Sequence, residues 1–379
     1  MAEQKPIVLI TGIAGNIGSA LAEALAGRYR VVGLDRAAPE GDYAFFEVDL
    51  TQDHSVAYAL HRFRERYGKR IASVVHLAAY FDFTGNEHPL YRQVNVDGTR
   101  RLLEELQAFE VGQLVYSGTM LVHAPARPGE RINEASGIAP KWAYPQSKAA
   151  AEEVIERAHG DIPYVLLHLA GLYDDESAVP TLAQQIARIY ERDLQSHLYA
   201  GDLAAGQAMV HKADMIDAFV RTIDRRERLP PALTLLVGET DGVGYQQLQQ
   251  RLGELIHGAD HWTTLQVPAP LAKVGAWVGS HAEPVVPDPI DQGEKPFVRP
   301  FMIEMASDHY ALDTSRARDL LEWSPRHDIR DTLPSIVAAL KRDPIGWYRA
   351  HDIVPPPWLT TAAEASDAPE ALRERAERH

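Results

Sequence analysis

The sequence contains no cysteine, and this absence excludes several kinds of site. Disulfide frameworks, zinc sites with thiolate ligands and a cysteine nucleophile all require that residue. No cluster of His, Asp or Glu side chains in the sequence has metal-ligand spacing, so we expect no metal. The chain also lacks an apolar run long enough to span a bilayer, and the polar residues 1–6 lead straight into an apolar stretch. We therefore expect no signal peptide, no membrane span and a cytoplasmic location.

Positive charge is scarce in this chain. Its 379 residues include 38 Lys and Arg against 53 Asp and Glu, which gives a formal net charge of −15. Such a surface repels phosphate backbones and anionic lipids, so nucleic acid and membrane surfaces are poor partners. Hydrophobic residues make up 45% and charged residues 24%, an ordinary globular balance. A chain of this length suits a larger and a smaller domain.

Short apolar runs alternate with helical stretches along the first half of the chain. We expect strands at 7–10, 30–34, 44–48, 71–77, 113–116 and 164–169, and helices at 16–26, 55–67, 90–109 and 145–158. Apolar strands separated by helices are typical of a parallel sheet that is covered on both faces. The predicted fold class is therefore α/β, with a doubly wound parallel sheet.

A glycine-rich segment joins the first expected strand to the first expected helix. Three glycines suit a tight turn, a close approach of the backbone to a pyrophosphate, and close packing of the helix on the strand. The free N–H groups at the start of the helix attract phosphates. The segment predicts a Rossmann-type sheet and a dinucleotide site at Gly12, Gly15, Asn16, Ile17 and Gly18.

The end of the second expected strand predicts which dinucleotide binds. Asp35 lies there, and its carboxylate can accept hydrogen bonds from the adenosine ribose diol while it repels a 2′-phosphate. NAD is therefore predicted, with NADP less favoured, although the next residue, Arg36, could soften that preference. Asp49 and Leu50 follow the third expected strand and are predicted to flank the adenine.

The alternation of strands and helices stops after Gly171. Helices are expected at 181–192, 212–225, 245–256, 314–321 and 333–341, separated by irregular pieces, and residues 263–305 are rich in Pro, Gly and Val. We predict an NAD-binding domain of residues 1–171, to which about 206–238 return. Residues 172–205 and 239–345 are predicted to form a smaller, loop-rich C-terminal substrate-binding lobe, and 346–379 a Pro-containing, charged tail.

Tyr144 and Lys148 form a Tyr-x-x-x-Lys pair that indicates acid–base chemistry. Residues four apart share one face of a helix. A nearby ammonium is expected to lower the phenol pKa, so that Tyr144 acts as a base toward an alcohol or as an acid toward a carbonyl. Thr119 lies 25 residues earlier, just after the fifth expected strand, where its hydroxyl can hydrogen-bond the reacting oxygen.

Taken together, these segments resemble the extended short-chain dehydrogenase/reductases, the NAD-dependent epimerase/dehydratase family. The resemblance covers about residues 6–342, with agreement in order and spacing. The matching segments are Thr11 to Gly18, Asp35, Asp49-Leu50, His76-Leu77-Ala78-Ala79, Asn95 to Thr99, Tyr116 to Thr119, Tyr144 to Lys148, Val210 to Asp214 and Asp313 to Pro325. It implies Thr119, Tyr144 and Lys148 as the catalytic set, with the lysine also holding the nicotinamide ribose. Further cofactor contacts are expected at Leu77, Ala78, Ala79, Asn95 and Ser117.

The chain departs from the sugar dehydratases of this family directly after Thr119. Those enzymes usually carry Asp-Glu there for acid–base work in eliminating water, and nucleotide-sugar decarboxylases use a Glu in the same stretch. This chain has Met120 and Leu121, which cannot move protons. Dehydration and decarboxylation by those routes are therefore disfavoured.

A second departure follows the sixth expected strand. Nucleotide-sugar enzymes typically read Arg-x-x-Asn-x-Tyr-Gly-Pro there, whereas this chain has His168 and Gly171 at the Arg and Asn positions. Asp174 and Asp175 would oppose a diphosphate. Residues 267–277 are apolar and resemble the substrate lobe of hydroxysteroid-dehydrogenase-like members, although a helix that packs on its own lobe has the same pattern.

The sequence leaves several functions open for a small-molecule substrate. The first is an NAD-dependent oxidoreductase that acts on a CH–OH or carbonyl group of a small, sugar-like or apolar compound. A nucleotide-sugar 4-epimerase is an alternative, because it needs only the same residues and the cofactor. A non-catalytic NAD-sensing protein is the third. A homodimer is expected, and His123, His168 and His211 are interpreted as structural polar groups.

Overall fold

The computed structural model describes residues 5–83, 85–192, 194–267 and 305–360. It divides into two units, which are described separately. The first unit comprises Met1–Leu172, Gly206–Gly242 and Asp308–Asp328, and the second comprises Tyr173–Ala205, Val243–Ser307 and Ile329–His379. No described helix combines the length and the apolar character needed to cross a membrane.

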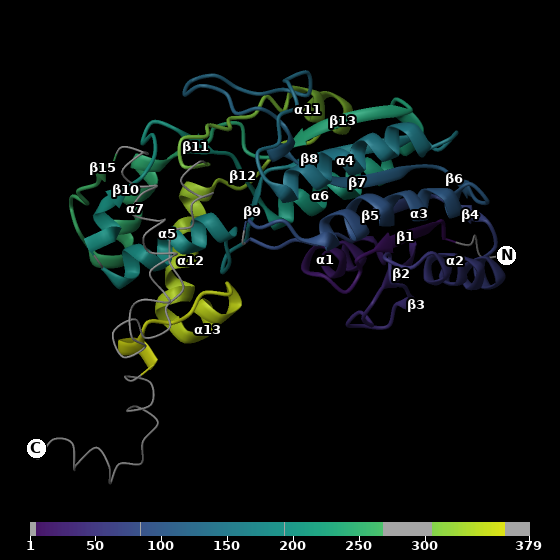
Figure 1. The fold of residues 1–379 in the computed structure, drawn as a ribbon, viewed down its shortest axis with the longest axis horizontal. Helices are drawn as coiled ribbons and strands as arrows, with labels where there is room; N and C mark the ends of the chain where they lie inside the picture. Colours follow the sequence, from purple (N-terminus) through teal and green to yellow (C-terminus); the bar gives the residue numbers. More distant parts are fainter. Residues whose placement is uncertain (1–4, 84, 193, 268–304, 361–379) are drawn as a thin grey trace, which may run out of the picture. The chain divides into compact units, whose positions relative to one another are not determined.

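The first unit is built around a seven-stranded sheet in which neighbouring strands run parallel. The strand order is β13-β8-β7-β5-β1-β2-β3 (Figure 1). These strands span Ile7–Thr11 (β1), Arg30–Asp35 (β2), Ala44–Glu47 (β3), Ser73–His76 (β5), Leu114–Thr119 (β7), Tyr164–Leu169 (β8) and Ala232–Val237 (β13). The strands are rich in Val, Ile and Leu because both faces of the sheet are covered.

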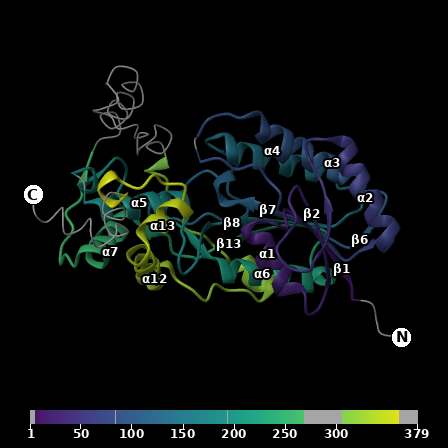
Figure 2. The same cartoon turned by 90° about the horizontal axis from the view of Figure 1, so that it is seen from below.

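Helices α1 and α6 cover one face of this sheet, and α2, α3 and α4 cover the other (Figure 2). The helices of the first unit are Asn16–Leu25 (α1), Asp53–Tyr67 (α2), Asp97–Leu106 (α3), Ala143–Ala158 (α4), Lys212–Asp224 (α6) and Ser315–Leu321 (α11), with shorter turns at Tyr91–Val96 (η1), Met120–Val122 (η2) and Arg226–Arg228 (η4). Its short strands are Arg70–Ile71 (β4), Glu110–Val111 (β6), Gly206–Gln207 (β11) and Met209–His211 (β12). Gly171–Tyr173 (β9) lies at the boundary of the two units.

The direction in which the chain crosses the sheet reverses beside β1. After β1 the chain proceeds to β2 and β3 on one side, then returns to β5, β7, β8 and β13 on the other. Such a reversal leaves a crevice at the carboxyl ends of the strands, where ligands bind in open α/β sheets. The α/β Rossmann-type fold predicted from the sequence is confirmed, and β13, which the sequence analysis did not name as a strand, completes the sheet.

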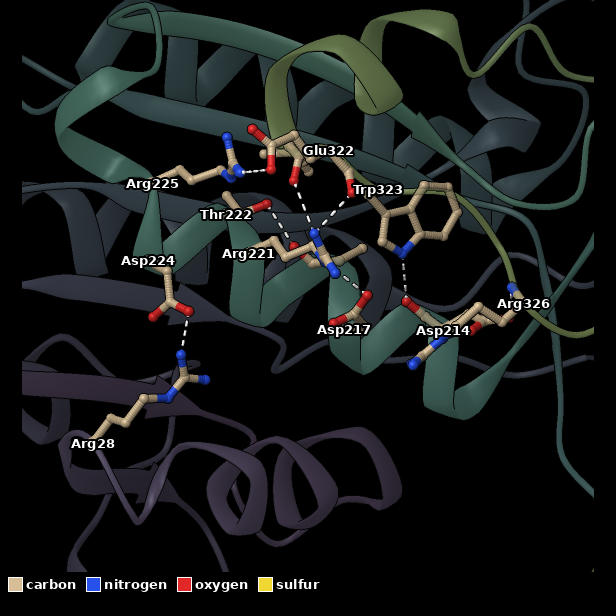
Figure 3. A network of polar contacts seen from close by, with 12 residues as sticks. Arg28, Asp214, Asp217, Arg221, Thr222, Asp224, Arg225, Glu322, Trp323 and Arg326 are labelled. Carbon is tan, nitrogen blue, oxygen red and sulfur yellow. Dashed lines mark hydrogen bonds and ion pairs between the residues drawn. The ribbon is translucent and has the colours of Figure 1, made fainter.

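Residues 308–328 belong to the first unit, whereas the sequence analysis assigned them to the substrate lobe. The reason lies on α6, where the buried Asp214 accepts hydrogen bonds from the backbone N–H groups of Arg326 (2.8 Å) and His327 (2.9 Å). The Trp323 indole donates to the Asp214 carbonyl at 2.9 Å (Figure 3). The segments 210–214 and 313–325, two of the matching motifs, therefore join each other.

The second unit contains α5 (Pro180–Glu191), η3 (Leu194–His197), β10 (Leu198–Tyr199), β14 (Val243–Gly244), α7 (Tyr245–His257), β15 (Leu265–Gln266), α12 (Ile329–Arg342) and α13 (Pro344–Ala350). Helix α13 corrects the expectation of a tail from residue 346, because Trp347 and Tyr348 are buried and the Trp347 indole donates to the Glu176 carbonyl. Most of the apolar segment 267–277, together with the rest of 268–304, lies outside the described residues.

One predicted helix has a different form. The expected helix 90–109 begins as a π-helix, η1, and continues as α3. π-Helical turns occur mostly as single turns at functional sites. Asn95 lies in this turn, and its side chain organises the loop described below.

Candidate functional site

At two of the three glycines of the glycine-rich loop, neighbouring backbone atoms leave no room for a side chain. Gly12 has a φ of +76°, and a Cβ there would lie 2.8 Å from the Ala78 nitrogen. A Cβ on Gly18 would lie 2.1 Å from the Gly12 oxygen. At Gly15, the N-cap residue of α1, a Cβ would meet only the Gly12 oxygen at 3.4 Å, an ordinary contact. Nothing in the described part of the protein therefore demands a glycine at position 15, and the free space there fits a phosphate at the helix N-terminus.

Asp35 is held in place at the end of β2. Its carboxylate accepts hydrogen bonds from the backbone N–H of Ala14 at 2.9 Å and of Arg36 at 2.7 Å. The Ala37 N–H donates to Oδ1 at 3.5 Å, so Oδ2 is the oxygen that retains a further lone pair, because an ionised carboxylate offers about four acceptor positions. The arrangement fits a ribose diol, while the Arg36 side chain is exposed.

The other predicted adenine contacts have different surroundings. Asp49 accepts hydrogen bonds from the Thr51 amide (2.9 Å) and hydroxyl (2.8 Å). Burial alone would raise the pKa of Asp49, but these bonds outweigh it and the pKa is lowered. The Leu50 side chain is buried in the core beneath α2 and α3, where a Cβ on Gly98 would lie 3.0 Å from it. Asn16 is exposed and Ile17 is partly buried at the start of α1.

A chain of hydrogen bonds joins the ends of β1 and β5 to η1 and α3. Ala78 N–H donates to Thr11 Oγ1 at 3.2 Å, and Thr11 lies 2.6 Å from His76 Nδ1. His76 Nε2 lies 2.9 Å from Thr99 Oγ1, which donates to the Asn95 carbonyl at 2.6 Å. Because each hydroxyl has one proton to donate, His76 carries its proton on Nε2. Burial, followed by the charge of Lys148, lowers the pKa of His76 to about 3, so this imidazole is neutral.

The Asn95 side chain is engaged with the protein. Its amide accepts a hydrogen bond from Tyr80 N–H at 2.6 Å and donates to the Tyr80 carbonyl at 3.0 Å and to Ser147 Oγ at 2.8 Å. Ser147 in turn donates to the Tyr144 carbonyl at 2.7 Å. These bonds hold the segment after β5 and the start of α4 in place, and the cofactor contact predicted for Asn95 stays a prediction.

Lys148 is buried beneath the end of β7. Its Nζ donates to the Ser117 carbonyl at 2.8 Å and lies 4.7 Å from the centroid of the Tyr116 ring and 5.9 Å from that of Tyr144. Burial lowers the pKa of Lys148 to about 8, and the Glu152 carboxylate opposes this effect. The Ser117 hydroxyl donates to the His76 carbonyl at 3.3 Å.

Tyr144 and Thr119 have hydroxyl protons available for a substrate. Among the described residues, Tyr144 Oη makes no hydrogen bond, and Thr119 Oγ1 only accepts one from Leu121 N–H at 3.3 Å. The expected net lowering of the Tyr144 pKa is not found in the protein alone. Burial, followed by the charges of Tyr91 and Glu152, raises the pKa of Tyr144.

Aromatic side chains surround the Tyr144 phenol, and the sequence analysis did not single them out. The Phe81 ring packs edge-on against Tyr144 with 4.8 Å between centroids, and 48% of its surface is exposed. Trp142 lies 5.5 Å from Tyr144 and 5.9 Å from Phe83. Tyr91 fixes the segment that carries both phenylalanines, because its hydroxyl bonds the Asp82 carbonyl at 2.7 Å and the Asp82 amide at 3.2 Å.

The departures from the family are accounted for by local structure. Met120 is buried in the core and Leu121 packs against that core, so neither side chain supplies an acid or a base. In the second unit, Asp174 accepts hydrogen bonds from Glu176 N–H at 3.0 Å and from the Ser177 amide and hydroxyl at 2.7 Å. That carboxylate closes a turn, which explains its presence without reference to a substrate.

The comparisons with known proteins begin with a family model. The model of the NAD dependent epimerase/dehydratase family matches residues 8–238. The dTDP-6-deoxy-L-talose 4-dehydrogenase (NAD(P)(+)) of Kitasatospora kifunensis is 25% identical over 89% of this chain and 96% of its own length. The decarboxylating sterol-4-alpha-carboxylate 3-dehydrogenase of Saccharomyces cerevisiae is 23% identical over 78% of this chain and 83% of its own length.

Solved structures share the fold. The UDP-glucose 4-epimerase of Thermus thermophilus, in complex with NAD, superposes with a TM-score of 0.63 at 21% identity, over 89% of this chain and 99% of that one. The UDP-glucuronic acid 4-epimerase of Bacillus cereus gives a TM-score of 0.64 at 19% identity, over 89% and 99% of the two chains. The predicted NAD cofactor is confirmed by the family model, whose description is that of an NAD-dependent family. The chain belongs to the NAD-dependent epimerase/dehydratase family and is an NAD-dependent oxidoreductase of that family.

Proposed function

We propose that this enzyme interconverts a secondary alcohol and its ketone, with Thr119, Tyr144 and Lys148 as catalytic residues. One observation carries the proposal. The buried Lys148 ammonium bonds the Ser117 carbonyl at 2.8 Å, which ties α4 to the carboxyl end of β7. Tyr144 and Thr119 therefore lie at the same edge of the sheet as the glycine-rich loop and Asp35.

The chemistry follows from the free hydroxyl groups. In the oxidation direction, Tyr144 in its phenolate form takes the proton from the alcohol while Thr119 Oγ1 donates a hydrogen bond to the same oxygen. When bound, NAD supplies the hydride acceptor. Lys148 favours the phenolate form of Tyr144 through its positive charge, against the burial that raises the phenol pKa. In the reverse direction Tyr144 returns the proton to the ketone oxygen.

The proposed cofactor preference is NAD over NADP. The Asp35 carboxylate is fixed by three backbone N–H groups, so it cannot turn away from a 2′-phosphate without losing these hydrogen bonds. Repulsion between the Asp35 carboxylate and the 2′-phosphate therefore lowers the affinity for NADP. Arg36 is exposed and does not pair with Asp35 through its side chain.

The proposed substrate carries an apolar ring beside its hydroxyl group. Phe81 is half-exposed next to Tyr144, and Phe83 and Trp142 extend the aromatic surface behind it. A flat apolar ring gains contact area there without placing a polar group against the rings. Met120 and Leu121 offer no acid–base pair, which agrees with oxidation or reduction rather than elimination.

The test is a turnover screen that follows NADH formation. The panel contains ring-bearing secondary alcohols, free sugars and UDP- and dTDP-hexoses. We expect ring-bearing alcohols to give the highest kcat/KM, and Phe81→Ala to raise their KM about fivefold to tenfold because roughly 1 kcal/mol of apolar contact is lost. Tyr58→Ala, which removes an exposed ring from α2, is the matched control and should change nothing. Equal KM values in Phe81→Ala and wild type would exclude the aromatic surface as the substrate site.

A nucleotide-sugar 4-epimerase is the second candidate. The observation in its favour is the Kitasatospora relative, which matches 89% of this chain and whose name describes action on a dTDP-linked sugar. The 4-epimerase reaction needs only the proposed residues and the cofactor. Conversion of a UDP- or dTDP-hexose to its 4-epimer, without release of NADH, would select this candidate over the dehydrogenase. NAD binding without turnover of any compound would select the sensor.

The substrate-binding lobe, the homodimer and the cytoplasmic location are still to be tested. The substrate-binding role predicted for residues 172–205 and 239–345 stays a proposal. The homodimer and the cytoplasmic location stay predictions from the sequence. Sedimentation of the purified chain and localisation of a tagged chain measure them.

A further inference from the structure

A buried chain of three titratable side chains runs from α4 to the segment after η2. Glu152 Oε2 lies 3.1 Å from His168 Nε2, His168 Nδ1 lies 2.9 Å from His123 Nε2, and His123 Nδ1 lies 3.0 Å from the Ser136 carbonyl. Exposure is 8% for Glu152, 2% for His168 and 0% for His123. The reaction described above uses none of these groups.

The Ser136 carbonyl sets the direction of every hydrogen bond in this chain. A carbonyl only accepts, so His123 carries a proton on Nδ1. Burial, followed by the charge of His168, lowers the pKa of His123 to about 4, so His123 is neutral and its Nε2 accepts. His168 must then donate from Nδ1. A single proton remains for the contact between His168 Nε2 and Glu152 Oε2, and the two groups share it.

Lys148, one turn earlier on α4, favours the location of the shared proton on His168 rather than on Glu152. Glu152 follows Lys148 by four residues on α4, so the two side chains share one face of the helix. An ammonium nearby favours the ionised carboxylate, and the ionised carboxylate favours a protonated imidazole. Gly118 pairs with His168 across β7 and β8, and a Cβ on Gly118 would lie 2.7 Å from Glu152 Oε1 and 2.8 Å from His168 Cδ2. The backbone therefore leaves room for this pair.

We propose that His168 and Glu152 form a buried ion pair whose carboxylate keeps Lys148 in its ammonium form, with His123 holding His168 in position. Glu152 and His168 are thus positioning residues for the catalytic lysine, an assignment that rests on the role proposed for Lys148. The titratable groups that face the pair are Lys148 and Tyr144 on α4, Tyr116 on β7, and His123. Burial, followed by the Glu152 charge, raises the pKa of Tyr116 well above its usual value, so that ring stays neutral.

The first arm of the test is spectroscopic and needs no substrate. Long-range ¹H–¹⁵N spectra of the full chain labelled at histidine report which ring nitrogens are protonated, and His123→Gln and His168→Gln identify the signals. We expect His123 as the neutral Nδ1–H form and His168, as the cation of the proposed ion pair, with both nitrogens protonated. In Glu152→Gln, His168 should lose the proton on Nε2. A neutral His168 in the wild-type chain, or His123 protonated on Nε2, would overturn the assignment.

The second arm measures the consequence for Lys148. The basic limbs of NADH affinity and of kcat/KM for alcohol oxidation report loss of the Lys148 proton, because the ammonium supports both. Removing the carboxylate charge should lower the Lys148 pKa, so both limbs should move to lower pH by about one unit in Glu152→Gln. His168→Gln removes the partner that holds the Glu152 carboxylate in place, so both limbs should move in the same direction. The double variant should add nothing further.

A matched control lies on the same helix. Glu153 is exposed and pairs with Arg157 at 2.9 Å, so Glu153→Gln removes a carboxylate that does not face Lys148 and should leave the limbs unmoved. Unchanged limbs in Glu152→Gln, with wild-type melting temperature and NADH bound, would overturn the inference. Failure of the proposed function is recognised separately, since it leaves every alcohol unconverted while the histidine spectra and the NADH titrations are still measured.

Discussion

Gly15→Ala tests whether this glycine serves the stability of the protein or the binding of NAD. The Gly15 backbone has φ −75° and ψ 166°, which alanine adopts without strain, and the new Cβ would meet only the Gly12 oxygen at 3.4 Å. Alanine is a poorer helix N-cap than glycine by about 0.5–1 kcal/mol, and reduced freedom of the unfolded chain offsets this by about 0.4–1 kcal/mol. The free energy of unfolding should therefore change by no more than about 0.5 kcal/mol.

The effect on NAD should be much larger. A pyrophosphate oxygen that accepts from an amide nitrogen approaches it to about 2.9 Å, and a methyl group at Gly15 would occupy the space through which it approaches. Loss of one charge-assisted hydrogen bond costs about 1.5–3 kcal/mol, which corresponds to an affinity lower by about 10- to 100-fold. Calorimetric titration with NAD measures the affinity, and urea unfolding without NAD measures the stability.

Two other glycines serve as controls. Gly18→Ala places a Cβ 2.1 Å from the Gly12 oxygen and 2.7 Å from Ile13 Cα, so it should lower the stability by about 1–3 kcal/mol as well as the affinity. Gly27→Ala meets nothing within 4 Å and should change neither. Wild-type NAD affinity in Gly15→Ala would refute the reasoning, because the pyrophosphate could not then lie at this helix terminus.

Three further predictions concern the catalytic pair, the cofactor preference and the core. Tyr144→Phe should lower kcat by about 10²- to 10⁴-fold with NAD affinity unchanged, whereas Lys148→Ala should lower both, as steady-state rates and titrations will show. Asp35→Asn removes the charge that repels a 2′-phosphate, so the ratio of NADP to NAD affinity should rise; an unchanged ratio would mean that Asp35 does not select. Asp214→Asn should cost about 2 kcal/mol of unfolding free energy. Burial would raise the Asp214 pKa, but hydrogen bonds from His327 and Arg326 outweigh burial, so the pKa is lowered. The stabilisation is therefore present above about pH 4 and is lost as the pH falls through the lowered pKa. Urea unfolding across that range should show that the variant loses less unfolding free energy in acid than the wild-type chain does.

Much of the sheet and the loop could be predicted because the evidence is local in the sequence. Short apolar runs such as 7–10 and 164–169 are typical of buried strands. The glycine spacing from Gly12 to Gly18 is typical of the turn that binds a dinucleotide. The Tyr-x-x-x-Lys spacing likewise places Tyr144 and Lys148 on one helix face without reference to any other element. These predictions needed no knowledge of which segments meet in space.

The features that were missed depend on contacts between distant segments. The hydrogen bonds from the Asn95 amide to Tyr80 and Ser147 join segments that are distant in the sequence, so no local pattern predicted them. Glu152 could have been found, since it follows Lys148 by four residues, but its partner His168 lies on β8 and no spacing rule connects them. The raised pKa of Tyr144 reflects burial among rings that come from another loop.

The return of the chain to β13 has a consequence for synthesis of the protein. Residues 232–237 pair with 164–169, so the outer side of β8 stays unpaired until roughly 60 more residues have left the ribosome, about 3–12 s at usual rates. During that interval the nascent chain presents an open apolar strand, the kind of surface that pairs with other chains. A chain truncated before residue 232 keeps that strand exposed permanently, and we expect it to aggregate even though it contains the complete glycine-rich loop and the Tyr144–Lys148 pair.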